Sequence, residues 1–137
     1  MEKKELRIFV AHAKGESDEG LIVMRDQITQ ALRKAFGARE PAVTLGRDDY
    51  AAHFQRAGSW DAWAREVATA VHPTTREPRY HGIVVPATRV GAATQAIVGQ
   101  ALGMGKPVLL FLDGKLTKAS RVVKVSARDF KTGWEVS

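Results

Sequence analysis

Residues 81–113 contain two apolar runs separated by a segment with helical spacing, and this pattern constrains the fold more than any other part of the chain. Residues 83–85 and 108–112 are continuously apolar, as in parallel strands that are buried on both faces. Between them, residues 90–105 place apolar side chains on one helical face, and Gly103 and Gly105 favour a helix end. The stretch therefore predicts a βαβ unit, whose strands need helices on both sides of the sheet.

The other segments supply the elements that such a sheet requires. Strands are predicted at 6–13, 41–45 and 122–126, and helices are predicted after Ser17 or Asp18 and after Ser59, which would cap them. Residues 46–50 and 113–115 are predicted to be a loop and a turn, and residues 50–58 are ambiguous. This order predicts one α/β domain over residues 1–137, a three-layer, doubly wound, flavodoxin-like fold with a mostly parallel five-stranded sheet of order 2-1-3-4-5.

Composition excludes several classes of site and partner. The 137 residues include no cysteine, which removes disulfides and thiolate chemistry, and no spanning segment or signal peptide is recognisable. We therefore expect a cytoplasmic protein without a membrane partner. The four histidines show no metal-ligand spacing, so neither a metal nor a cofactor is predicted.

The formal net charge of +6 attracts phosphates, nucleic acids and acidic proteins alike. The basic residues near the C-terminus suit either a charged edge strand or a surface for a protein partner. They are Lys115, Lys118, Arg121, Lys124, Arg128 and Lys131. No recognition helix or aromatic and basic platform is recognisable, so specific nucleic-acid binding is not expected, while a homodimer stays open.

In a sheet of order 2-1-3-4-5, ligands bind beyond the carboxyl ends of the strands, where the first and third strands separate. Three segments should converge there, at residues 12–20, 46–50 and 87–95. The chain has neither of the two standard phosphate-loop signatures. The predicted ligand-binding residues are the polar side chains and glycines of these segments: His12, Lys14, Gly15, Arg47, Thr88, Arg89, Gly91, Thr94 and Gln95.

Asp48 and Asp49 are the candidate catalytic residues, because a carboxylate in a loop at the strand ends could act as an acid or a base. An Asp-Asp pair after a strand is also common turn chemistry, and Arg47 could bind a phosphate or pair with the two acids. Trp60 and Trp63 share a helical face and suit core packing, although Trp60 could stack on a base if it lies near the strand ends.

Residues 91–108, from Gly91 to the Lys106-Pro107-Val108 strand start, resemble the third helix of nucleoside 2-deoxyribosyltransferase-like proteins. They are also similar to the equivalent helix of TIR domains, whose first strand looks like residues 7–13 (RIFVAHA). The resemblance covers about residues 6–112 in the order of elements. It implies a Rossmann-like domain that recognises or cleaves the N-glycosidic bonds of nucleotides.

Both families carry a catalytic glutamate on this helix, and this chain departs from them there. Counting back from Gly99 puts the glutamate position at Ile97, and counting forward from Gly91 puts it at Gln95. An isoleucine can neither attack an anomeric carbon nor stabilise an oxocarbenium-like centre, and a glutamine has no negative charge.

Three functions follow from these observations. We expect a domain that binds a nucleotide- or nucleoside-derived small molecule without cleaving it, a pseudoenzyme. The first alternative is an active N-glycosidase or deoxyribosyltransferase that uses Asp48 or Asp49. The second is a non-enzymatic accessory or host-modulating factor that binds a protein partner.

Overall fold

The computed structural model describes residues 4–13, 15–69, 79–87, 91–122 and 134–136. Within these ranges the helices are α1 (Asp18–Ala35), α2 (Gly46–Ala57), α3 (Trp60–Ala68) and α4 (Ala92–Gly103). The strands are β1 (Lys4–Val10), β2 (Arg39–Leu45), β3 (Gly82–Pro86), β4 (Val108–Leu112), β5 (Lys115–Val122) and β6 (Trp134–Val136).

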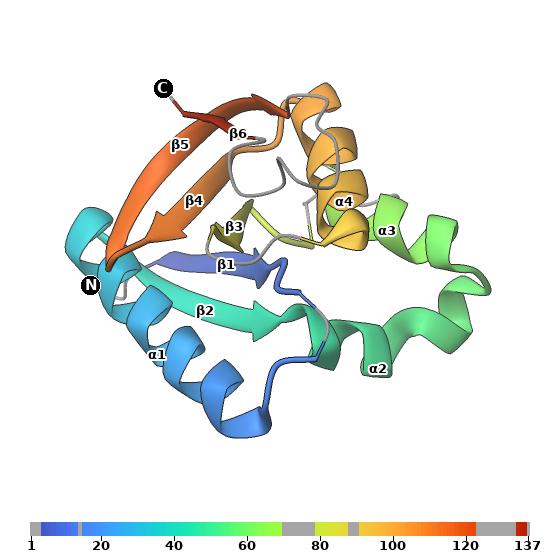
Figure 1. Ribbon diagram of the computed structural model, residues 1–137, viewed down its shortest axis with the longest axis horizontal. Helices are drawn as coiled ribbons and strands as arrows, with labels where there is room; N and C mark the ends of the chain where they lie inside the picture. The colour runs from blue at the N-terminus through green and yellow to red at the C-terminus, as the bar shows by residue number, and fades with distance from the viewer. Residues whose placement is uncertain (1–3, 14, 70–78, 88–90, 123–133, 137) are drawn as a thin grey trace.

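The centre of the sheet is parallel. β1 pairs with β2 along its whole length and with β3 near its carboxyl end, and β3 pairs with β4. β5 runs antiparallel to β4, and the short β6 pairs with β5 at the edge, so the strand order is β2-β1-β3-β4-β5-β6 (Figure 1). The predicted flavodoxin-like α/β fold and its order 2-1-3-4-5 are confirmed. The switch point lies between β1 and β3.

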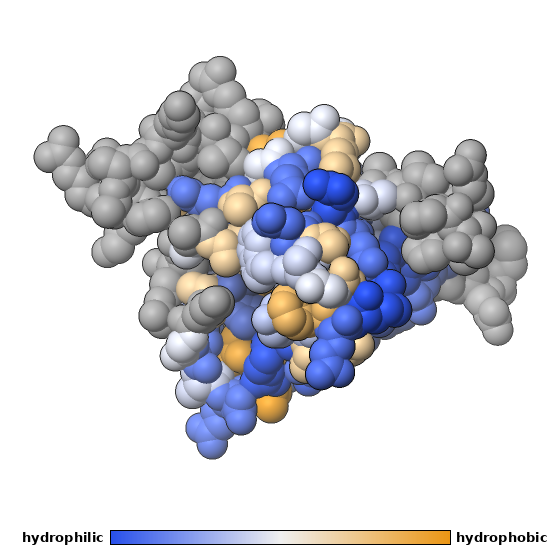
Figure 2. Space-filling model, turned by 90° about the vertical axis from the view of Figure 1, so that its right-hand side faces the viewer, coloured by the Kyte–Doolittle hydropathy of each residue, from blue (hydrophilic) through white to orange (hydrophobic). Residues whose placement is uncertain are grey.

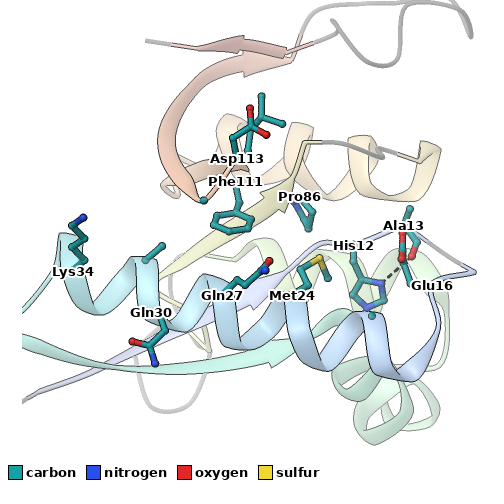
Figure 3. A pocket seen from close by; sticks show the side chains of 14 residues that line it. His12, Ala13, Glu16, Met24, Gln27, Gln30, Lys34, Pro86, Phe111 and Asp113 are labelled. Carbon is teal, nitrogen blue, oxygen red and sulfur yellow. Dashed lines mark hydrogen bonds between the residues drawn. The ribbon is translucent and has the colours of Figure 1, made fainter.

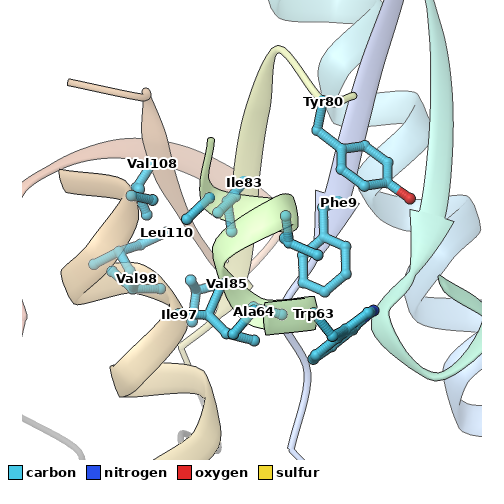
Figure 4. Packing of buried hydrophobic residues seen from close by; sticks show 14 residues of the cluster. Phe9, Trp63, Ala64, Tyr80, Ile83, Val85, Ile97, Val98, Val108 and Leu110 are labelled. Carbon is cyan, nitrogen blue, oxygen red and sulfur yellow. The ribbon is translucent and has the colours of Figure 1, made fainter. Parts of the chain in front are cut away.

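Helices cover both faces of the sheet, and the alternation of side chains along β1 divides the core accordingly. Leu6, Ile8 and Val10 pack with α1, whereas Phe9 packs on the opposite face with α3 and α4. Figure 4 shows the second cluster, in which Phe9, Trp63 and Ile97 lie close together. Full burial of each large apolar side chain contributes about 1.5–3 kcal/mol, so this packing holds α3 and α4 against the sheet.

Two helix starts lie where the sequence predicts them. The Ser17 hydroxyl accepts a hydrogen bond from the Gly20 amide at 3.1 Å and caps α1. The Ser59 hydroxyl accepts from the Ala62 amide at 3.1 Å and caps α3. Each bond satisfies an amide that the first turn of a helix leaves without a backbone acceptor.

The prediction of a loop at residues 46–50 is wrong, because these residues form the first turn of α2. Leu45 occupies the N-cap position and makes no side-chain cap. The sequence around α2 therefore lacks the local signal from which a helix start is normally predicted. The cap comes from His12, which is far from α2 in the sequence.

The fifth strand lies earlier than predicted. β5 covers Lys115–Val122 rather than residues 122–126, and Lys115 pairs directly with Leu112. Asp113 and Gly114 have positive φ angles of 51° and 76°, as the two-residue turn of a tight hairpin requires. Lys115 and Lys118 are exposed on β5, whereas Lys124, Arg128 and Lys131 of the predicted basic surface lie outside the described residues.

Among the helices in the described ranges, none combines the length and the apolar character needed to cross a lipid bilayer.

Candidate functional site

A cavity of about 350 Å³ opens at the switch point, between the carboxyl end of β1 and the starts of α2 and α4. Figure 2 views the molecule from the side towards which β1 and β2 point, and hydrophobic residues lie there between strongly hydrophilic ones. We call this the switch-point cavity. Its lining residues are Phe9, Ala11, His12, Ala13, Gly15, Glu16, Leu21, Gly46, Arg47, Tyr50, Trp60, Trp63, Ala93, Thr94 and Ile97.

The structure brings together four of the predicted ligand-binding residues, since His12, Gly15, Arg47 and Thr94 all line the switch-point cavity. Gly91 is the N-cap of α4, and Gln95 lies in the first turns of the same helix; neither lines the cavity. The Nε2 atom of Gln95 is buried and has no hydrogen-bond partner among the described residues. Lys14, Thr88 and Arg89 lie outside the described residues.

Aromatic rings form one wall of the cavity. Phe9 and Trp63 are buried and meet edge to face, with ring centroids 6.0 Å apart. Tyr50 is 39% exposed and meets the Trp63 ring edge-on at 5.1 Å, and Trp60 is half-buried beside Trp63 at 6.2 Å. Trp63 therefore belongs to the core, whereas Trp60 and Tyr50 offer partly exposed ring surface to the cavity.

His12 joins the end of β1 to the start of α2. The Arg47 amide donates to the Nε2 atom of His12 at 3.1 Å, so Nε2 carries no proton, and the protonated Nδ1 donates to the Ala13 carbonyl at 2.9 Å. The ring thus caps α2 in place of a local side chain. Gly46 permits this approach, because a Cβ atom there would lie 3.0 Å from the Val10 carbonyl oxygen and 3.1 Å from the Phe9 ring.

Arg47 is held between two carboxylates at the edge of the cavity. Its Nη1 donates to Asp18 in the first turn of α1, and its Nε donates to Asp48 at 3.2 Å. Both acids lie at helix N-termini, where the helix dipole favours negative charge. Of the two roles predicted for Arg47, pairing with the neighbouring acid is the one visible in the structure.

Asp49 points away from the cavity into the protein interior and is only 2% exposed. Its carboxylate accepts hydrogen bonds from the Trp63 indole at 2.8 Å, from Arg79 and from the Tyr80 hydroxyl. Arg79 also donates to Glu66 at 2.8 Å. Burial, followed by the hydrogen bond to Asp49, raises the pKa of Tyr80.

This network fastens α2 to α3 and to the residues just before β3. Neither Asp48 nor Asp49 lines the switch-point cavity. The arrangement of Asp49 favours a structural role, whereas Asp48 is half exposed and pairs with Arg47 at the edge of the cavity.

Ile97, one of the two positions at which the resemblance would place the glutamate, is 4% exposed and lines the cavity from α4, whereas Gln95, the other position, does not line it. Glu16, in the segment between β1 and α1, is the acidic residue among the described residues that line the cavity. Glu16 and Tyr50 line the cavity, although neither was among the predicted site residues. An acidic residue in the loop after the first strand is the signal that could have identified Glu16.

A second, larger hollow of about 700 Å³ lies on the other face of the sheet, between α1 and the carboxyl end of β4 (Figure 3). Met24, Gln27 and Lys34 border it from α1, and Phe111 and Asp113 border it from β4 and the turn after it. His12 and Glu16 line both hollows. The segment between β1 and α1 thus separates the two.

No group of three or more metal-binding side chains occurs within the described ranges. Comparisons with family models, with curated proteins and with solved structures find no match to this chain.

Proposed function

We propose that this chain binds a nucleoside- or nucleotide-derived small molecule in the switch-point cavity, with the base against Trp60 and Tyr50. The observation that carries the proposal is the position of this aromatic wall beyond the carboxyl end of β1, beside the starts of α2 and α4. In doubly wound sheets, ligands bind at this point. The cavity volume of about 350 Å³ lies within the range of small-molecule pockets, roughly 300–1,000 Å³.

The chemistry of the wall supports a flat aromatic ligand. Base stacking on an aromatic side chain contributes about 1–3 kcal/mol per base. Neither Ile97 nor Gln95, the two positions at which the resemblance would place a glutamate, carries a carboxylate, and this supports binding over cleavage by a residue of α4. The alternative of an active N-glycosidase that uses Asp48 or Asp49 is less favoured, because Asp49 is buried with three donors from the chain and Asp48 pairs with Arg47.

Calorimetric titration with adenosine, adenosine monophosphate, NAD and ADP-ribose tests the proposal. At least one of these should bind, and Trp60→Ala should weaken its binding by about 5- to 150-fold, the equivalent of about 1–3 kcal/mol. Phe36→Ala is the matched control, because Phe36 is 41% exposed and lines neither hollow. This variant should bind as the parent does.

The absence of binding to the whole panel at millimolar concentration would contradict the proposed function. Unchanged affinity in Trp60→Ala would contradict the aromatic wall as the site of the base.

A further inference from the structure

Most of the polar side chains that line the switch-point cavity already have partners within the chain. Both ring nitrogens of His12 are engaged, and the Trp63 indole donates to Asp49. The hydroxyl of Thr94, which is 3% exposed, points to the carbonyls of Ala11 and His12, at 3.4 Å from each. These groups shape the cavity and have little remaining capacity to bind a ligand.

The cation at the cavity is also occupied. Arg47 lies between Asp18 and Asp48, so one positive charge faces two negative ones. The carboxylates of Asp18 and Asp48 would repel a phosphate that approached Arg47. Among the described residues, this edge of the cavity is therefore unfavourable for a phosphate.

Glu16 differs from these groups because it is an exposed carboxylate on the cavity lining. A carboxylate offers about four acceptor positions, so it can accept hydrogen bonds from a ligand alongside a partner in the chain. Two adjacent hydroxyl groups present two donors to such an acceptor, and hydrogen bonds to an ionised carboxylate are among the stronger ones. A sugar diol fits this requirement, whereas a phosphate would add a third like charge to the two beside Arg47.

We propose that Glu16 is a specificity-determining residue that accepts hydrogen bonds from the sugar hydroxyls of the ligand, and that this end of the cavity selects a diol over a phosphate. The inference rests on the proposed function, since the base stacked on the aromatic wall places the sugar within the cavity. No bond is made or broken in this role.

Calorimetric titration with paired probes tests the assignment. The probes are adenosine, guanosine, cytidine and uridine, the 2′,3′-dideoxy form of each, and the monophosphate of each. For the parent, at least one ribonucleoside should bind roughly 10-fold or more tightly than its dideoxy form and more tightly than its monophosphate. Glu16→Gln should remove most of the preference for the ribonucleoside over its dideoxy form, and it should leave the affinity for the dideoxy form unchanged.

Glu19→Gln is the matched control, because Glu19 is an exposed glutamate in the first turn of α1 that lines neither hollow. It removes the same charge from the same neighbourhood and should leave every affinity unchanged. Thermal unfolding of both variants establishes that they fold as the parent does.

The possible failures are distinguishable. If no probe binds the parent, the proposed function and the inference both fall. If nucleosides bind and Glu16→Gln leaves the ribose preference intact, the role of Glu16 is wrong while the proposed function stands. Tighter binding of the monophosphates than of the nucleosides would overturn the preference for a diol over a phosphate.

Discussion

Asp49 and Glu16 are both carboxylates that follow parallel strands near the switch point, and the chain surrounds them differently. Asp49 is buried and receives three donors from Trp63, Arg79 and Tyr80. Glu16 is exposed and borders two hollows. Position after a strand therefore does not decide the role of an acid. Burial and three donors suit Asp49 to stabilising the fold, whereas exposure at the cavity suits Glu16 to the ligand role proposed above.

The largest effect should come from Asp49→Asn. The variant replaces one acceptor oxygen by an amide group that faces donors, and it leaves Arg79 without its buried counter-charge. We expect the free energy of unfolding in urea to fall by about 3–5 kcal/mol, the cost of breaking a buried pair. Asp48→Asn, at an acid with a half-exposed side chain, should lower it by less than about 1 kcal/mol.

If Asp49→Asn lowered the free energy of unfolding by less than about 1 kcal/mol, the buried site of Asp49 would be no more important for stability than the half-exposed site of Asp48. At temperatures where this variant is folded, its affinity for nucleosides should equal that of the parent, because Asp49 does not line the cavity.

Lys106 is a buried cation. It is 3% exposed, and its Nζ donates to the Val67 carbonyl in the last turn of α3 at 3.0 Å. Burial, helped by the charges of Arg79 and Arg7, lowers its pKa from 10.5 to about 8. Between these values the unfolded chain binds more protons than the folded chain, so the free energy of unfolding should rise as the pH increases from 8 towards 10.

The size of this rise should be on the order of 1–3 kcal/mol, and Lys106→Met should abolish it in urea unfolding curves recorded at several pH values. Tyr80 opposes this rise only slightly, because its pKa is raised from the ordinary value of 10.0 and its destabilising contribution sets in near the top of this pH range. A parent and a variant whose stabilities change in parallel from pH 8 to 10 would rule out this role for Lys106.

The smallest change in the free energy of unfolding should come from breaking an ion pair on the surface. Arg33 donates to Glu40 at 2.8 Å, but both side chains are about half exposed, at 49% and 48%. Solvent screening limits such a pair to about 0–1 kcal/mol, so Glu40→Gln should change the free energy of unfolding by no more than that. A loss comparable to that of Asp49→Asn would show that burial is not what separates the two pairs.

The parts of the fold that local sequence signals specify were predictable. Ser17 and Ser59 cap the helices that follow them, and the continuous apolar runs become the central strands. The hairpin between β4 and β5 was also encoded locally, because Asp113-Gly114 is a strong two-residue turn signal that should have placed a strand directly after it.

Features that depend on residues far apart in the chain were not predictable. The cap of α2 comes from His12, which lies 35 residues before Arg47. The partners of Asp49 include Arg79 and Tyr80, which lie 30 and 31 residues after it. A sequence pattern indicates that an acid follows a strand. It does not indicate which donors the folded chain will bring to that acid.

The direct junction between Leu45 and Gly46 has a consequence for protein engineering. β2 ends at Leu45 and α2 begins at the next residue, so no spacer is present to absorb a change in length. One inserted residue would turn the helix by about 100° around its axis. Asp49 would then leave its donors and Tyr50 would leave the aromatic wall in a single step, which makes this junction unsuitable for grafting a tag or a reporter.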